Sequence, residues 1–185
     1  MSFSSVPKRL RAFWRDTDGA VSMEFILSVP IIFWAFAATF VFFDGYRQSS
    51  VNLKAAYTVS DLLSRETGLV TDEYIDSMHD LLQILTGASS PTILRVSIIE
   101  WDEDDGRYYV HWSANRGYAE ALNDDDMEAI EDRLPKMPDR EQIILVETRN
   151  TFYPLYKMGM GEIDLDNFVF TRLRFAPKLD WGAPA

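Results

Sequence analysis

The pattern of hydrophobic and polar positions begins with an apolar segment and then becomes periodic. Residues 25–43 form a run of 19 residues without a charged side chain. A helix of that length is about 28 Å long, which is close to the thickness of the hydrocarbon core of a bilayer. We therefore expect this segment to be a membrane-spanning helix.

The helical pattern continues beyond the apolar run, over residues 46–66. We therefore expect a single helix that leaves the membrane and becomes amphipathic. Its predicted apolar stripe consists of Leu53, Ala56, Val59 and Leu63. Gly68 is the expected stop signal. Thr71, followed by two acidic residues, is typical of the start of a second helix, which Gly87 ends.

From Thr92 the period of the pattern changes to two, which is typical of strands. Two alternating runs joined by residues 102–106 predict a β-hairpin. A short helix is expected to start at the acidic residues 124–126, and prolines close it. Two further strands are expected over 142–152 and 168–175, with an irregular stretch between them.

This order of elements predicts an α+β fold, with an antiparallel sheet that carries its helices on one face. We expect a long N-terminal membrane-spanning helix that continues into an amphipathic helix. That helix packs with a second helix on a small antiparallel sheet of about four strands. The roughly 140 residues that follow the apolar run fit one domain of ordinary size.

Charge limits the partners and sets the expected topology. The net charge is −11, but the first 43 residues hold four basic against three acidic residues, so the excess of acid lies in the rest of the chain. Such a surface repels phosphate groups, so nucleic acid is excluded as a partner and anionic lipid surfaces are unfavourable for the domain. Basic residues precede the apolar run, which predicts a cytoplasmic N-terminus and an exported, periplasmic domain. These residues are Lys8, Arg9, Arg11 and Arg15.

The residues that usually carry catalysis are sparse. Cysteine is absent, which excludes disulfides and thiol nucleophiles. The two histidines, His79 and His111, lack the spacing of zinc ligands, and we interpret both as structural. No nucleophile elbow, phosphate-binding glycine loop or paired-histidine motif occurs, although a triad assembled from distant residues stays open. We therefore expect no enzymatic activity, no catalytic residue and no cofactor.

Two acidic clusters offer the oxygen ligands that calcium prefers. They are residues 102–105, and Asp164 and Asp166 together with Asn167. The first cluster lacks the alternating spacing of a calcium loop, and its end at Asp105-Gly106 is already explained as a turn. We assign no metal ligand, while calcium binding by these loops stays open.

Three interpretations of the N-terminal region compete. An uncleaved signal anchor needs only the basic flank and the apolar run. A secretory signal peptide is suggested by the small residues of Ala35-Phe36-Ala37, yet the apolar run continues where a polar cleavage region is expected. Neither interpretation explains Glu24, a carboxylate placed against the apolar run. A charge at that boundary is costly unless it has a partner.

Cleavage after Gly19 supplies such a partner. The new amino terminus is then Ala20, and Glu24 lies four residues later, on the same helix face. The peptide Gly19-Ala20-Val21-Ser22-Met23-Glu24-Phe25, with basic residues before it and an apolar helix after it, resembles the prepilin processing site of the type IV pilin superfamily. More narrowly, it is similar to the TadE/TadF-like minor pseudopilins of the tight-adherence (Flp) pilus system.

The resemblance covers about 45 residues and implies a processing scheme. A membrane aspartyl prepilin peptidase cuts between Gly19 and Ala20, and Glu24 and Phe25 act in processing and assembly. The domains are then a cleaved cytoplasmic leader (1–19), a transmembrane pilin-like helix (20–43) and a periplasmic α+β pseudopilin domain (44–185). The length of the chain favours a minor component over the short major pilin or the larger TadG-like relatives.

Pro30 interrupts the apolar run and removes one backbone donor, so we expect a helix kink there. Either a flexible point used in assembly or an ordinary membrane proline explains it.

The leading hypothesis is a minor pilin-like protein of the bacterial inner membrane. Its expected partners are prepilin peptidase, other pilins or pseudopilins, the pilus assembly platform, and membrane lipid through residues 25–43. The alternatives are an uncleaved, single-pass, membrane-anchored periplasmic binding or sensory module, and a membrane-tethered hydrolase.

Overall fold

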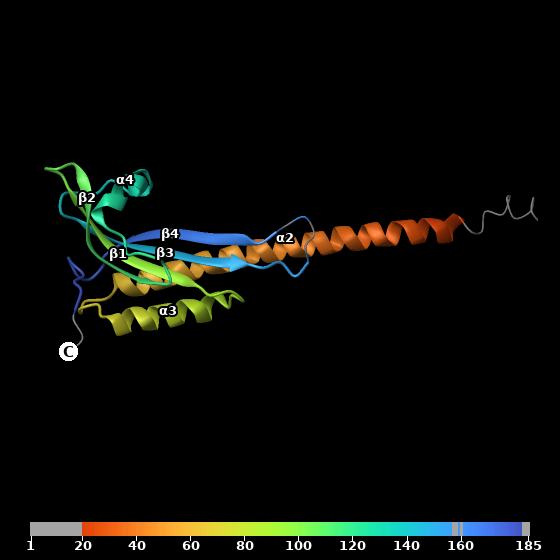
Figure 1. Cartoon of the computed structure of the whole chain (residues 1–185), viewed down its shortest axis with the longest axis horizontal. Coiled ribbons are helices and arrows are strands. Elements are labelled where there is room, and N and C mark those ends of the chain that lie inside the picture. Colours follow the sequence, from red (N-terminus) through yellow and green to blue (C-terminus); the bar gives the residue numbers. More distant parts are fainter. Residues whose placement is uncertain (1–19, 157–158, 160, 183–185) are drawn as a thin grey trace, which may run out of the picture.

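The computed structural model describes residues 20–156, 159 and 161–182 (Figure 1). One helix, α2 (Ala20–Ser64, 45 residues), runs from the apolar segment into the domain, where a second helix, α3 (Asp72–Thr86), lies beside it. The remaining elements are β1 (Ile93–Asp102), β2 (Arg107–Arg116), the short helices η2 (Asp124–Asp126), α4 (Met127–Ile130) and η3 (Glu131–Arg133), β3 (Gln142–Phe152) and β4 (Ile163–Arg172).

The four strands form one antiparallel sheet in the order β2-β1-β3-β4. The β1–β2 hairpin and the strand 142–152 lie where the alternating pattern predicted them. The α+β class, the long helix, the second helix and the four-stranded antiparallel sheet are thereby confirmed. Ile98 and Ile99 flank a bulge at which the pairing of β1 with β2 shifts.

The predicted bounds of the last strand are wrong. It begins at Ile163, not at residue 168, and ends at Arg172. The missed part contains the acidic residues Asp164 and Asp166, so this stretch of sequence lacks the alternation of apolar residues that predicts a strand. They belong to the strand because Asp166 pairs across the sheet with Arg149, and Asp164 accepts a hydrogen bond from Thr151.

Local signals set the ends of the second helix as expected. Thr71 is its N-cap, with its hydroxyl accepting a hydrogen bond from the Tyr74 N–H at 3.3 Å. Gly87 follows the last turn in a left-handed conformation (φ 52°), which glycine adopts without strain. The long helix ends at Ser64, two residues before its predicted end.

The sheet is covered on both faces, which corrects the expectation that helices lie on one face only. Helices α2 and α3 bury one side of the sheet. The buried residues on this side are Ala55, Val59, Leu63, Val70, Ile75, Leu82, Leu94, Val96, Ile98, Ala114, Ile144, Val146 and Leu179. The segment from η2 to η3 and the loop after it cover the other side, where Met127, Leu134 and Met137 pack near Ile143 and Leu145. Because β3 alternates, its successive apolar residues serve both cores.

Candidate functional site

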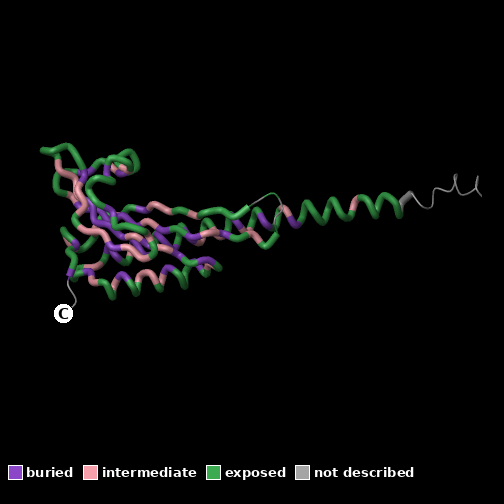
Figure 2. Tube along the Cα trace, in the orientation of Figure 1, coloured by how far each residue is buried: buried purple, intermediate pink, exposed green. Residues whose placement is uncertain are grey.

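The first half of α2 is apolar and mostly exposed. Figure 2 shows that this half extends away from the domain as an exposed helix, whereas the second half is buried along one side. In the part of the chain that the structure describes, α2 is the one helix long and apolar enough to cross a membrane. Its exposed side chains include Phe25, Ile26, Leu27, Ile31, Ile32, Phe33, Trp34 and Phe36.

The residues on which the processing hypothesis depends lie at the N-terminal end of this helix. Ala20 is the first described residue of α2, while Gly19 lies outside the described residues. Glu24 and Phe25 both project from the helix, and both are exposed. Since α2 is helical from Ala20 onward, Ala20 and Glu24 are one turn apart on the same face. The structure thus holds the spacing that the charge-pairing hypothesis requires.

Pro30 lies within α2, and the helix is continuous through it (Figure 1). A proline at this position has no N–H to donate to the carbonyl of Ile26, four residues earlier. In a bilayer such a carbonyl needs another donor or close helix neighbours. The predicted kink remains a prediction.

A stripe of small residues extends the buried side of α2 into the apolar run. Ala37 and Val41 are only 8% and 1% exposed, although their neighbours Phe36 and Phe40 are exposed. With the buried Gly45 they continue, at spacings of four residues, the face that packs on the sheet. The buried side of α2 therefore reaches about two turns into the segment predicted to span the membrane.

Polar side chains fix α2 to the sheet further along. Asn52 donates to Asn150 of β3 at 2.6 Å, and Ser60 donates to Thr171 of β4 at 2.6 Å. Gln48 donates both to Asn52 and to the Thr86 carbonyl at the end of α3. Sequence reasoning missed these groups because it followed apolar positions. It placed Leu53 on the buried stripe, but Leu53 is 42% exposed and Asn52 is buried.

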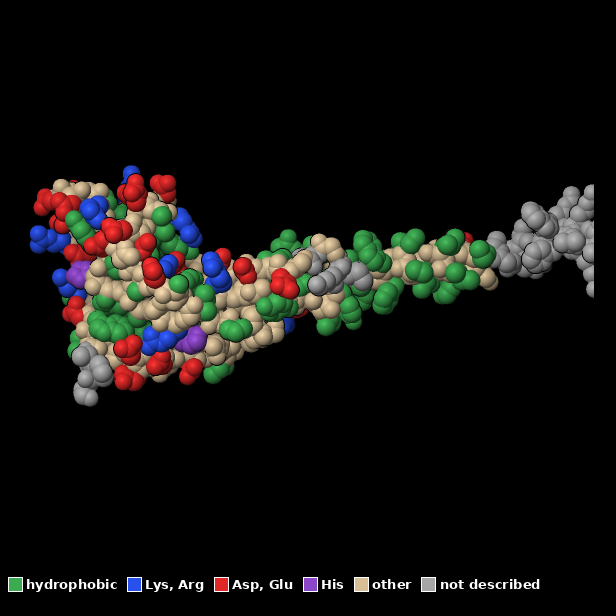
Figure 3. All heavy atoms as spheres, in the orientation of Figure 1, with side chains coloured by type: hydrophobic (Ala, Val, Ile, Leu, Met, Phe, Trp, Pro, Cys, Tyr) green, Lys and Arg blue, Asp and Glu red, His purple; other side chains and the backbone are tan. Residues whose placement is uncertain are grey.

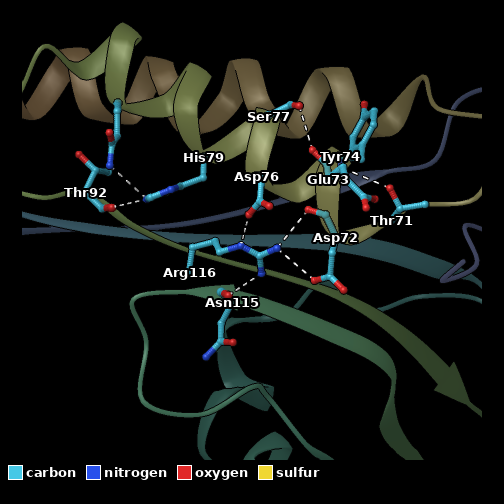
Figure 4. Close-up of polar contacts among 11 residues, drawn as sticks. Thr71, Asp72, Glu73, Tyr74, Asp76, Ser77, His79, Thr92, Asn115 and Arg116 are labelled. Atoms are coloured by element: carbon cyan, nitrogen blue, oxygen red, sulfur yellow. Dashed lines mark hydrogen bonds and ion pairs between the residues drawn. The ribbon is translucent and has the colours of Figure 1, made fainter. Parts of the chain in front are cut away.

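The two histidines both have structural partners. His79 on α3 lies 2.6 Å from the carbonyl of Thr92, so its Nε2 carries the proton and donates (Figure 4). His111 lies 2.7 Å from the carboxylate of Glu100. Burial opposes the charge on Glu100, but hydrogen bonds from Gln142 and His111 outweigh it and hold the pKa of this carboxyl below its ordinary value. Within the described residues, neither imidazole is hydrogen-bonded to a serine or threonine hydroxyl.

A polar cluster beside His79 ties α3 to the sheet. Arg116 at the end of β2 points at the first turn of α3, where it pairs with Asp76 and donates to Asp72 at 3.1 Å (Figure 4). The hydrogen bond to Asp76 raises the pKa of Arg116 above its ordinary value. All of these groups hold elements together, so we assign the cluster a structural role.

The acidic loops are engaged with protein donors. Asp102 accepts hydrogen bonds from the backbone N–H groups of Asp104 and Asp105, which forms the tight turn of the hairpin. Asp164 and Asp166 are bound to Thr151 and Arg149, as described for β4. Among the described residues, no group of three histidine or acidic side chains is arranged to hold a metal ion.

An open groove of about 560 Å³ lies between the β1–β2 hairpin and the short helices. It is lined by Trp101, Tyr108, Glu131, Asp132, Leu134, Lys136 and Met137. Its charged side chains are exposed at the rim, and Tyr108 uses its hydroxyl to bind the Pro135 carbonyl.

The comparisons with known proteins found no match. No protein-family model matches the chain, and neither a curated protein nor a solved structure is significantly similar to it.

Proposed function

We propose that this chain is a minor, TadE/TadF-like pseudopilin of a tight-adherence pilus machine, inserted in the bacterial inner membrane by α2. One observation carries the proposal. A single continuous helix has a first half that is exposed and apolar and a second half that forms part of the domain core. In such a helix, any contact made by the apolar half fixes the position of the domain. A subunit that assembles through its helix requires this link.

Glu24 supports the proposal by its position. Placing a carboxylate in the hydrocarbon costs about 2.5–3.5 kcal/mol near the centre of a membrane helix, and less at its edge. Glu24 is exposed on α2, at the edge of the apolar run. An ammonium group at Ala20, one turn earlier, neutralises it within the chain or on a staggered neighbour. Only cleavage after Gly19 creates that ammonium group.

The exposed side of α2 carries a regular stripe of uncharged residues that favours helix packing. Its members are spaced alternately by four and three residues, which is the seven-residue repeat of helices that pack side by side. They are Phe25, Val29, Ile32, Phe36, Thr39, Phe43, Tyr46, Ser50, Leu53 and Tyr57, and all are exposed. The stripe continues beyond the apolar run and along the domain, so a partner helix has a long surface to follow.

Each residue then has a defined role. Gly19 and Ala20 are the bond that prepilin peptidase cuts, Glu24 orders helix packing, and Phe25 is an adjacent recognition residue. Pro30 is the point at which the helix bends during transfer from bilayer to assembly. The domain faces the periplasm and supplies protein contacts to other pilins and to the assembly platform. The protein assembles and does not catalyse a reaction.

Mass spectrometry of the N-terminus tests the proposal. The full chain is expressed in cells with and without an active prepilin peptidase, and the purified protein is measured intact. We expect a chain that begins at Ala20 only when the peptidase is active. A full-length chain in both cells contradicts the proposal and favours the alternative, an uncleaved membrane-anchored binding or sensory module.

A further inference from the structure

The two ends of the β3–β4 connection lie beside α2 at the level where the apolar run ends. A groove of about 250 Å³ separates these ends from α2, lined by Phe42, Gly45, Tyr46 and Ser49 of α2 and by Phe152, Ile163 and Leu165. Phe152 is the last residue of β3 and Ile163 is the first of β4. Both ends of the connection are therefore beside the last turns of the apolar helix.

The hairpin of β3 and β4 advances along α2 toward the apolar run. Thr171 is bonded to Ser60 of α2, and Asn150, nearer the turn of the hairpin, is bonded to Asn52. Figure 1 shows the described parts of the connection beside α2, past the end of the sheet. Buried positions on α2 extend beyond this level to Ala37, about 9 Å from Phe43 along the helix.

The side chains of residues 153–156, which follow β3, are uncharged, and three of the four are exposed. Residues 153–156 read Tyr-Pro-Leu-Tyr. The two tyrosines are half exposed, and Leu155 is 70% exposed. Tyrosine combines an apolar ring with a polar hydroxyl and is enriched at the boundary between lipid and water, where both parts are satisfied.

The distribution of charge over the domain also favours contact with the bilayer near the connection. In Figure 3 most charged side chains lie on the end of the domain away from the apolar run, a few lie along the domain as far as the connection, and hydrophobic side chains cover α2 beyond it. An acidic domain is repelled by anionic headgroups. Contact with the bilayer is therefore most favourable through an uncharged segment. Residues 153–156 carry no charge.

We propose that residues 153–156, the interfacial segment, enter the headgroup layer of the leaflet from which α2 emerges. The domain is then held at two points, α2 and the interfacial segment, which fixes its rotation and tilt relative to the membrane. The proposal rests on membrane insertion of α2, which is part of the proposed function, and does not depend on pilus membership.

Fluorescence quenching by lipid tests this proposal. The chain has no cysteine, so single cysteines label one position each. Three variants of the full chain are made: Leu155→Cys in the interfacial segment, Leu69→Cys as the matched control, and Phe33→Cys within the apolar run. Leu69 is 62% exposed and lies at the far end of the domain, where its neighbour Val70 bridges to Trp181. Each variant is labelled with an environment-sensitive fluorophore and reconstituted into phosphatidylcholine vesicles with and without spin-labelled phosphatidylcholine.

We expect quenching at position 155 to be at least about twofold stronger than at position 69, with a blue-shifted emission at position 155. Quenching at position 33 reports insertion of α2. If position 33 is quenched and position 155 is not, the interfacial segment faces water or a protein partner, and this inference alone is overturned. Equal quenching at 155 and 69 also overturns it, because the whole domain then lies on the bilayer. A label at position 33 that lipid does not quench overturns both this inference and the membrane insertion on which it rests.

Discussion

Asn52 of α2 and Asn150 of β3 form a reciprocal amide pair in the buried contact between helix and sheet. Asn52 Nδ2 donates to Asn150 Oδ1 at 2.6 Å, and Asn150 Nδ2 donates back to Asn52 Oδ1 at 3.3 Å. The two residues are 98 positions apart in the chain, and both are less than 5% exposed. The pair fixes which turn of α2 faces which residue of β3, because any shift of the helix leaves two buried amides unpaired.

Removing one member of the pair is expected to destabilise the domain. In Asn52→Leu the amide of Asn150 stays buried without its partner, which costs about 1–3 kcal/mol of unfolding free energy. Thermal denaturation of the detergent-solubilised chain, followed by circular dichroism, measures the loss. Ser50→Ala, at an exposed position of the same helix, is the control and should leave the midpoint unchanged. The double variant Asn52→Leu/Asn150→Leu should lose less than the sum of the single variants, and additive losses argue against a coupled pair.

Substituting two glycines of similar backbone conformation distinguishes the cost of backbone strain from the cost of steric overlap. Gly117 and Gly159 have φ angles of 89° and 85°. A Cβ on Gly117 lies 2.3 Å from Cγ2 of Ile93, whereas a Cβ on Gly159 meets no atom of the described residues within 4 Å. Gly159→Ala is expected to cost about 1–2 kcal/mol through the backbone alone. Gly117→Ala should cost about 1–3 kcal/mol more, because the strand residue Ile93 has to move. Equal midpoints of thermal unfolding for the two variants contradict this.

The carboxylate of Glu66 is expected to contribute to stability in a pH-dependent way. Backbone N–H groups of Gly68 and Thr67 donate to it and hold its pKa below the ordinary value of 4.5. A lowered pKa means that the contribution is present above pH 4.5 and is lost as the pH falls through the lower, folded value. Glu66→Gln should therefore lose less stability on acidification than the parent chain. Glu162→Gln removes the same charge at another exposed position and is the matched control. An unchanged acid slope in Glu66→Gln shows that the turn does not depend on this charge.

The role of Glu24 in assembly is tested by removing its charge alone. Glu24→Gln keeps the size and the hydrogen-bonding ability of the side chain, so insertion of α2 into the membrane should be intact or improved. Association with pilin partners should fall, because the amide cannot neutralise the terminal ammonium group. Membrane fractionation measures insertion, and co-purification from cells with an active prepilin peptidase measures association. Glu73→Gln, on α3, controls for the change in net charge. Undiminished co-purification of partners means that charge pairing at Glu24 does not order the assembly.

The sequence by itself determined the elements whose signals are local. The uncharged run, the period-two strands, the cap at Thr71 and the left-handed Gly87 each depend on a few neighbouring residues, so the order of elements and the α+β class followed from them. The candidate processing peptide is also a local pattern, and the helical spacing of Ala20 and Glu24 was readable from the chain alone.

Only the tertiary structure decided the features that join distant residues. Asn52 was missed because a polar residue looks exposed until its partner, 98 positions away, is known. The early start of β4 depends on the pairing of Asp166 with Arg149 across the sheet. A short window of sequence holds one half of each of these contacts, whereas burial and pairing are properties of both halves together.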